Sequence, residues 1–380
     1  MIISRLVLKN WRNFRTLDVQ FTGRVFVIGP NASGKSNLLD VFRFLRDIAK
    51  PGGGLQWAVA HRLGLSKVRC LAARKDPDVE IEVELSDEGG PPQWRYALGI
   101  TQEARGYRQP VLRFEKVWRH DSLILERPDD DDRSDKVRLT QTHLEQINSN
   151  AEFRVMARFF ESIRYLHLVP QLLRNPEAFQ GPSIPDDPYG RNFLEMVAKT
   201  PEKTRRSRLK RIENALRQAV PQLKGLTDAK DDAGIPHLEA TYAHWRPNAG
   251  RQREDQFSDG TIRLIGLFWS LLEGESPLLL EEPELSLHAG IVAKLPALFH
   301  RLQRKRKRQI FVSTHSADLL SQKGIGGEEV VMLRPDKEGT VVELASSIGE
   351  VRDLLDAGLS VADVALPRTA PPIGQLELFE

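Results

Sequence analysis

Cysteine and long apolar runs are nearly absent from this sequence. Cys70 is the single cysteine among 380 residues, which excludes an internal disulfide framework and a cysteine-based zinc cluster. The longest apolar stretch, residues 264–272, has nine residues, far fewer than the roughly 20 that a membrane helix needs. The N-terminus carries basic and polar residues without the apolar block of a signal peptide. We therefore expect a cytoplasmic protein with no membrane segment.

A strong excess of one charge is also absent. Lysine and arginine number 55 and aspartate and glutamate 52, which gives a formal net charge of +3. This balance alone does not indicate a nucleic-acid partner. Any such indication has to come from local clusters of basic residues. The hydrophobic content of 40% and the charged content of 28% are those of an ordinary globular protein. At about 150 residues per domain, the length fits either two domains or one large domain with insertions.

The alternation of apolar and polar residues predicts an α/β protein. In the N-terminal third, strands are expected at 2–9, 17–21, 24–28, 79–85, 93–100, 111–118 and 122–126, with a helix at 37–49. The region 143–224 has helical texture, interrupted by a strand at 164–169. In the last third, helices are expected at 261–272 and 291–308, and strands at 278–280, 309–313, 329–333 and 340–344.

We divide the chain into four segments from this pattern. Residues 1–126 form the N-terminal part of one domain, with an antiparallel β subdomain, and residues 256–345 form its C-terminal part. Between them, residues 127–255 are expected to be a mainly helical insert or lid, and residues 346–380 a C-terminal helix and tail. The acidic run at 129–132 is interpreted as a solvated loop.

Residues 29–36, GPNASGKS, fit the phosphate-loop pattern G-x-x-x-x-G-K-[ST]. An apolar strand precedes the loop and a helix follows it, as the pattern requires. Glycines let backbone N–H groups curl around phosphate oxygens, Lys35 supplies a positive charge, and Ser36 offers a hydroxyl to Mg²⁺. An ordinary glycine turn before a helix is the alternative. The candidate nucleotide contacts are Gly29, Asn31, Ala32, Ser33, Gly34, Lys35, Ser36 and Asn37.

Two acids, Glu281 and Glu282, end the apolar strand 278–280. At the carboxyl edge of a sheet beside a phosphate loop, the first acid can hold Mg²⁺ through water, and the second can deprotonate the attacking water. Two solvated acids at the start of a loop are the alternative. The pair is a weak signal alone and a strong one after a phosphate loop.

Two further segments lie where ligands could bind. Residues 258–261, SDGT, open the helix 261–272 about 20 residues before the acids. Ser258 is a good helix cap, and a helix start with a serine and Gly260 is also an anion site. His315 follows the strand 309–313, at the edge where ligands bind in open α/β sheets. A structural histidine there is the alternative.

In this order of motifs the sequence resembles the ABC-type ATPase heads of RecF, SMC and Rad50 proteins. It resembles more closely the stand-alone bacterial AAA family ATPases, which are related to the ATPase half of OLD-family proteins. The segments that carry the resemblance are NWRNF at 10–14, GPNASGKSN at 29–37, FSDGTIRL at 257–264, LLLEEPELSLH at 278–288 and STHS at 313–316. The resemblance implies a P-loop fold with a mixed central sheet, an antiparallel β subdomain and a helical insert.

The resemblance also implies cofactors and roles. ATP and Mg²⁺ would be bound, with Ser36, Glu281 and Gln171 near the metal and Glu282 as catalytic base. Further roles are those of a signature loop for Ser258 and Gly260, a D-loop for residues 285–288, a γ-phosphate sensor for His315 and a nucleotide contact for Arg12. Two heads would form a homodimer around ATP, and assembly into a higher oligomer is a further possibility.

Three departures narrow the resemblance. Glu281 stands where ABC heads usually carry aspartate, and the signature reads SDGT instead of SGGQ; both are usual in the OLD-like subgroup. The region 127–255 has no heptad run long enough for an SMC arm. About 65 residues follow the histidine strand, too few for the nuclease domain of OLD proteins, so a nuclease would have to be a separate chain.

The resemblance therefore implies an ATP switch that acts with a separate nuclease or toxin effector in bacterial anti-phage defence. RecF-like DNA repair and a non-hydrolysing scaffold that sequesters an effector remain alternatives. Double-stranded DNA is a candidate partner because residues 203–217 hold seven basic side chains, the first Lys203 and the last Arg217. Residues 301–308 hold six in eight, but cations at a helix end also complement its dipole.

Overall fold

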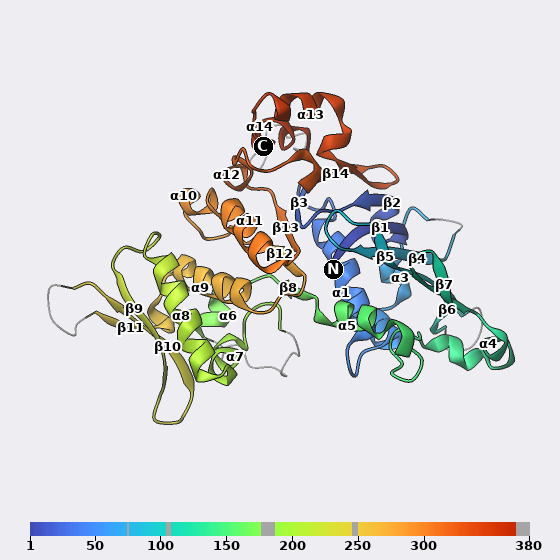
Figure 1. The fold of residues 1–380 in the computed structure, drawn as a ribbon, viewed down its shortest axis with the longest axis horizontal. Helices are drawn as coiled ribbons and strands as arrows, with labels where there is room; N and C mark the ends of the chain where they lie inside the picture. The colour runs from blue at the N-terminus through green and yellow to red at the C-terminus, as the bar shows by residue number, and fades with distance from the viewer. Residues whose placement is uncertain (74–75, 104–107, 176–186, 245–249, 370–380) are drawn as a thin grey trace, which may run out of the picture. The chain divides into compact units, whose positions relative to one another are not determined.

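The computed structural model describes residues 1–73, 76–103, 108–175, 187–244 and 250–369 (Figure 1). The chain forms two compact units. The first contains Met1–Ile163, Ser276–Leu279 and the chain from Pro296 onward; the second contains Arg164–Glu275 and Leu280–Leu295. The expected segments cut the chain differently, because residues 127–163 lie in the first unit.

The first unit contains an antiparallel sheet in the order β2-β1-β4-β5-β6-β7. Its strands are β1 (Ile2–Trp11), β2 (Phe14–Gln20), β4 (Val79–Ser86), β5 (Pro92–Gln102), β6 (Pro110–Arg119) and β7 (Ser122–Arg127). Buried and more exposed residues alternate along β4, as in a sheet with one face toward the core. All the strands expected in this part of the chain are present, to within a few residues at their ends.

A mixed sheet provides the centre of the first unit. The strands β15 (Gly339–Leu344), β14 (Val330–Asp336), β3 (Arg24–Ile28), β13 (Ile310–Thr314) and β12 (Leu278–Glu281) are neighbours in that order. β3 is parallel to both β13 and β14, whereas β15 is antiparallel to β14. Every residue of β3 and β13 is buried, as expected for parallel strands covered on both faces.

Helices complete the first unit. Helix α1 (Lys35–Ala49) contacts β13 and α5 (Arg154–Ser162), and Phe42 packs on Phe311 with ring centroids 5.0 Å apart. The shorter helices are α2 (Leu55–Ala60), α3 (Leu65–Val68), α4 (Asp130–Ser134), α12 (Ala317–Leu320), α13 (Gly349–Asp356) and α14 (Val361–Val364). The expected helix 291–308 is two helices, α10 (Ala289–Val292) and α11 (Leu295–Arg306), because Pro296 has no backbone N–H and favours a helix start.

The side chain of Gln309 joins the two sheets of the first unit. Its amide oxygen accepts a hydrogen bond from the backbone N–H of Ile3 at 2.8 Å. Its amide nitrogen donates to the carbonyls of Ile3 at 2.8 Å and Thr22 at 2.9 Å. Gln309 precedes β13 and Ile3 lies in β1, so residues some 300 positions apart in the chain are held together at a buried point.

The acidic run at 129–132 was expected to be a solvated loop, and the structure differs: Asp129 caps helix α4 and the run begins that helix. Asp132 is fully buried and accepts two hydrogen bonds from the guanidinium of Arg127, at 2.9 and 2.7 Å. The same guanidinium donates to the buried carboxylate of Glu115 at 3.1 Å. A buried arginine thus pairs with two buried carboxylates, an arrangement that a run of consecutive acids does not reveal.

The second unit combines helices with a small antiparallel sheet. Its helices are α6 (Pro170–Arg174), α7 (Phe193–Lys199), α8 (Glu202–Leu216), α9 (Asp259–Leu272) and α10, and β8 (Arg164–Leu166) is a short strand. β11 (Arg251–Arg253), β10 (Pro236–Tyr242) and β9 (Leu223–Lys230) form a three-stranded sheet that the sequence reading did not anticipate. β10 has few β-branched residues and begins with proline, so its strand signal is weak.

Helix α9 forms the centre of the second unit. Almost all of its residues are buried, which fits a helix that is apolar on all sides. Helix α8 packs against it, with Arg208 5.1 Å from the ring centroid of Trp269, and the apolar residues Leu209, Ile212 and Leu216 of α8 are buried. Among the described residues, no helix is long and apolar enough to cross a lipid bilayer.

Candidate nucleotide-binding site

The loop between β3 and α1 has the backbone of a phosphate-binding loop. Ala32 and Gly34 have positive φ angles of 62° and 100°, and the carbonyl of Gly34 accepts the first helical hydrogen bond from Leu38 N at 2.9 Å. A Cβ at residue 29 would lie 2.8 Å from the carbonyl oxygen of Leu333, so Gly29 is required by space. The two glycines therefore have separate physical reasons to be there.

Lys35 lies inside this loop. Its ammonium donates to the carbonyls of Gly29 at 2.8 Å and Pro30 at 3.1 Å, and the residue is 7% exposed. Ser36 is exposed in the first turn of α1. A cation in the loop, a helix N-terminus and an exposed hydroxyl fit the phosphates of ATP and a bound Mg²⁺.

The loop is fixed from the side by residues that the sequence reading did not assign. The amide nitrogen of Asn13, in the turn between β1 and β2, donates to Ser33 O at 2.8 Å and to Thr340 Oγ1 at 2.6 Å. Thr340 Oγ1 itself donates to Ser33 O at 2.8 Å, and Asn37 Nδ2 donates to Asn13 Oδ1 at 2.8 Å. A Cβ at residue 34 would lie 2.1 Å from the Asn13 amide, so Asn13 also requires Gly34.

Replacing Asn13 with alanine should weaken ATP binding about 10- to 100-fold. The change removes three hydrogen bonds that hold the loop and leaves the buried carbonyl of Ser33 with one fewer donor, which costs about 1–3 kcal/mol. Titration calorimetry with ATP would measure the change. Gln20→Ala, on an exposed position of β2, is the control and should bind as the wild type does. Equal affinities for both variants would contradict a role of Asn13 in shaping the loop.

Arg12 is next to Asn13 but contacts helix α1 in this structure. Its guanidinium donates to Asp40 Oδ2 at 2.9 Å and to the carbonyl of Lys67 at 3.3 Å. Asp40 also pairs with Arg62 at 2.8 Å. Burial opposes ionisation of Asp40, yet Arg62, Arg43 and Arg12 keep the pKa of its carboxyl below the usual value. The nucleotide contact of Arg12 stays a prediction, and the structure gives this residue a further role in orienting α1.

The structure brings His315 to the same sheet edge as the phosphate loop. Thr314, the last residue of β13, pairs with Ile28, the last residue of β3. His315 and Gly29 therefore both follow directly from adjacent parallel strands. His315 is exposed, and Ser316 behind it caps α12 by accepting from Leu319 N at 3.3 Å. Its role as a γ-phosphate sensor stays a prediction.

The two candidate acids lie in the second unit. Glu281 ends β12, and the hydroxyl of Tyr165 donates to its Oε2. Glu282 has a left-handed backbone, with φ of 43°, and its carbonyl accepts from Arg263 at 3.3 Å. Such a backbone is costly for a residue with a side chain and concentrates at functional sites. The metal and base roles of the two acids remain predictions.

The signature segment packs on the segment that follows the acids. Ser258 caps α9 by accepting from Thr261 N at 3.2 Å. A Cβ at residue 260 would lie 2.9 Å from the carbonyl oxygen of Ser286, so Gly260 allows close contact with the predicted D-loop. Ser286 has a left-handed backbone, with φ of 63°. Two candidate regions that are far apart in sequence thus touch within one unit.

Gln171, the candidate metal contact, is held by the signature helix. Its side-chain amide donates to Asp259 Oδ2 at 3.3 Å, and Arg174 from the same helix α6 pairs with Asp259 Oδ1. Arg263 lies on α9 and is 5% exposed. Burial lowers the pKa of Arg263, while the charges of Glu284, Asp259 and Glu282 raise it. These hydrogen bonds do not show whether Gln171 contacts a metal, and that role stays a prediction.

The functional residues missed by sequence reasoning are polar side chains that support the motifs. Asn13 and Arg263 lie inside the segments NWRNF and FSDGTIRL, so their positions within a motif were a usable signal. Thr340, Tyr165 and Arg174 lie in segments without a motif. Only the fold brings Thr340 to the phosphate loop, Tyr165 to Glu281 and Arg174 to Asp259.

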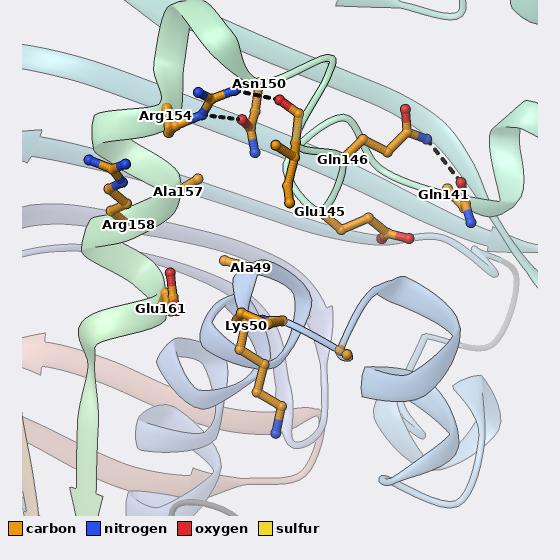
Figure 2. A pocket seen from close by; sticks show the side chains of 14 residues that line it. Ala49, Lys50, Gln141, Glu145, Gln146, Asn150, Arg154, Ala157, Arg158 and Glu161 are labelled. Atoms are coloured by element: carbon orange, nitrogen blue, oxygen red, sulfur yellow. Dashed lines mark hydrogen bonds between the residues drawn. The ribbon is translucent and has the colours of Figure 1, made fainter.

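A separate cavity of about 550 Å³ lies at the other end of α1 (Figure 2). Three cations line it: Lys50 lies 3.8 Å from the ring centroid of Trp57, Arg154 donates to Asn150 Oδ1 at 3.1 Å, and Arg158 is the third. The C-terminal end of a helix carries a partial negative charge. This cavity is therefore poorly suited to phosphate, and the loop at the N-terminal end of α1 is the candidate nucleotide site.

Comparisons with known proteins agree with this geometry. A family profile described as "AAA domain, putative AbiEii toxin, Type IV TA system" matches residues 24–321. The chain is similar to an SMC head bound to the C-winged helix domain of ScpA, with a TM-score of 0.55 and 13% identity over 90% of this chain and 98% of that chain. An SMC head with a coiled coil and joint from Pyrococcus yayanosii gives a TM-score of 0.50 and 12% identity over 93% and 99% of the two chains.

A curated relative matches over a short segment. The DNA replication and repair protein RecF of Aliivibrio salmonicida (strain LFI1238) is 48% identical over 46 residues. The match covers 12% of this chain and 13% of that protein. The structural likeness therefore shows the P-loop fold of SMC heads, and the match to RecF supports it over a small part of the sequence.

Proposed function

Because the chain belongs to this family of AAA domains, a P-loop ATPase family with an SMC/RecF-like head fold, we propose that it is an ATP-driven molecular switch. ATP binding would close two copies of the chain head to head, and hydrolysis would release them. The observation that carries the proposal is the phosphate loop, preformed with Lys35 inside it and locked by Asn13 and Thr340. A loop built only to cap a helix needs none of these contacts.

The chain's own residues would divide the chemistry as follows. Backbone N–H groups from Gly29 to Ser36 and the ammonium of Lys35 would bind the phosphates. Bound Mg²⁺, held near Ser36, Glu281 and Gln171, would neutralise charge on the phosphates. Glu282 would accept a proton from the attacking water. Its left-handed backbone, with a carbonyl anchored by Arg263, supports this assignment because it directs the side chain at a conformational cost.

Dimerisation is proposed from the features of the signature helix. Ser258 and the N-terminus of α9 can bind an anion. In the proposed dimer this anion would be the γ-phosphate of an ATP molecule held by the second copy. Contact between Gly260 and Ser286 would link that event to the D-loop. His315 would sense the γ-phosphate from the edge of the sheet that carries the phosphate loop.

Double-stranded DNA is the proposed ligand of helix α8. Three cations of the helix and its C-cap pair with acids of the same helix: Arg206 with Glu202, and Lys210 and Arg217 with Glu213. The pair of Arg206 with Glu202 is exposed on both sides and contributes little, so phosphates can compete for Arg206, whereas Glu213 is buried. Within the described chain, Lys203 and Arg211 have no acid within salt-bridge distance, and both are exposed. No base-reading motif accompanies the helix, so binding would be salt-dependent and weakly sequence-specific.

Steady-state ATP hydrolysis, measured with and without duplex DNA across a salt series, tests this function. We expect turnover that rises with DNA and loses that rise as salt increases. Reversing the two unpaired charges, Lys203→Glu with Arg211→Glu, should reduce DNA affinity at least tenfold while basal hydrolysis stays unchanged. Glu202→Gln, which changes an exposed acid of the same helix, is the control. Equal DNA binding by wild type and the reversed variant would exclude α8 as the contact.

A separate effector, a nuclease or a toxin, completes the proposal, with anti-phage defence as its setting. The family description, which names a toxin of type IV systems, supports it. RecF-like repair is the second candidate, supported by the segment shared with a DNA replication and repair protein. A scaffold that binds ATP without turnover is the third. Neighbouring genes separate the first two, since a nuclease or toxin gene favours defence and recombination genes favour repair.

A further inference from the structure

We propose that Tyr165 is a positioning residue for the acid Glu281. Tyr165 lies on β8, 116 residues before Glu281, and its hydroxyl donates to Glu281 Oε2. The residue is 8% exposed, so its ring has a fixed place in the second unit. This inference rests on the proposed ATPase function, in which Glu281 lies near the bound Mg²⁺.

The chemical reason lies in the length of the Glu281 side chain. A glutamate has one methylene group and one rotatable bond more than an aspartate, so its carboxylate can take more positions. Ordering such a side chain costs conformational entropy. A hydrogen bond from a phenol to a charged carboxylate is stronger than one between neutral groups. Tyr165 would thus restrict the longer side chain to one place without neutralising its charge.

The position of the phenol fits this role better than a purely structural one. A tyrosine has only two side-chain torsions, and a buried ring holds its hydroxyl at a defined point. The hydroxyl contacts the acid itself, at the carboxyl end of β12, and the neighbouring acid Glu282 has its own anchor in Arg263. The two adjacent acids are therefore each tied by a separate residue, one at the side chain and one at the backbone.

A double-mutant cycle between residues 165 and 281 tests the inference. Tyr165→Phe keeps the ring and removes only the hydroxyl. We expect the Mg²⁺ concentration for half-maximal turnover to rise about tenfold, with little change in the maximal rate at saturating Mg²⁺. Manganese binding to the protein–ADP complex, followed by electron paramagnetic resonance, should weaken by a similar factor. Binding of ADP without metal should stay the same.

The Glu281→Asp background gives the decisive comparison. An aspartate is too short to reach the phenol from the same backbone position, so Tyr165→Phe should then change manganese binding less than twofold. The control is Tyr189→Phe, a more exposed tyrosine of the same unit, which should leave all quantities unchanged. A loss of the same size in both backgrounds would overturn the inference, as would unchanged manganese binding in Tyr165→Phe.

Failure of the inference can be told from failure of the proposed function. If the wild-type protein neither binds manganese with ADP nor hydrolyses ATP, the proposed function itself is wrong. If the wild type does both and Tyr165→Phe does not differ from it, only the positioning role is wrong. Thermal unfolding without nucleotide should match between the two proteins, which separates positioning from stability.

Discussion

Replacing Glu282 with glutamine should slow ATP hydrolysis by about 10²- to 10⁴-fold, the range expected when a general base is removed. Glutamine has nearly the same shape and keeps the backbone as it is, so the φ of 43° and the hydrogen bond from Arg263 to the carbonyl should persist. ATP binding at the loop that contains Lys35 should be unaffected. The variant should therefore accumulate as an ATP-bound dimer, which sedimentation velocity with and without ATP would detect.

The matched control for this variant is Glu275→Gln. Glu275 is an exposed acid shortly before β12, so its loss should leave hydrolysis and oligomeric state unchanged. A Glu282→Gln protein that hydrolyses ATP at the wild-type rate would remove this residue as the base. One that binds ATP and stays monomeric would contradict the switch. A wild-type protein that binds ATP without turnover would favour the scaffold alternative.

Replacing Arg127 with methionine should destabilise the first unit by about 3–5 kcal/mol at pH 7.5. Among the described residues, Arg127 is the only cation that bonds both Asp132 and Glu115. Its removal leaves two buried carboxylates without their shared positive partner, which is costly. Urea unfolding followed by tryptophan fluorescence would measure the loss. Arg133→Met, which removes an exposed arginine paired with exposed Asp130, should change stability by less than about 0.5 kcal/mol.

The loss caused by Arg127→Met should shrink as the pH falls from 7.5 toward 5. In the wild type, burial opposes ionisation of Asp132, but the hydrogen bonds from Arg127 hold its pKa well below the usual value. Its stabilising contribution is therefore complete across this range. Burial raises the pKa of Glu115, against the hydrogen bond from His143 N and the charge of Arg127. Without Arg127 both values rise, so protonation near pH 5 relieves the buried charge. A deficit that grows toward pH 5 would contradict this account.

The sequence predicted the elements whose local pattern is strong. The buried strand before the phosphate loop, the helix after it and the four strands from Val79 to Arg127 appear in the structure nearly as expected. Glycine spacing, an apolar run and a following helix are all local signals. The family resemblance added the order of the later motifs, and the P-loop ATPase fold that it implied is confirmed.

The remaining features could not be predicted because they depend on residues distant in the chain. Nothing in the local sequence of Thr340 indicates that its hydroxyl bonds to Ser33, more than 300 residues earlier. Asp132 belongs to a run of acids whose other members are more exposed, and only the fold places it beside Arg127. The strands β9 and β10 each contain one β-branched residue, so the stability of this sheet comes from packing against the rest of the second unit.

The contacts of the first unit also fix the order of events while the chain is being synthesised. β3 is made early, yet both of its strand neighbours, β13 and β14, lie roughly 300 residues later. At about 5–20 residues per second, β3 waits between about 15 and 60 s for them. During that time a strand that is apolar after its first residue, Arg24, has neither of its partners in the sheet. A newly made chain should therefore need a chaperone over this interval, and it can gain its nucleotide loop only when the segment that contains Thr340 has emerged.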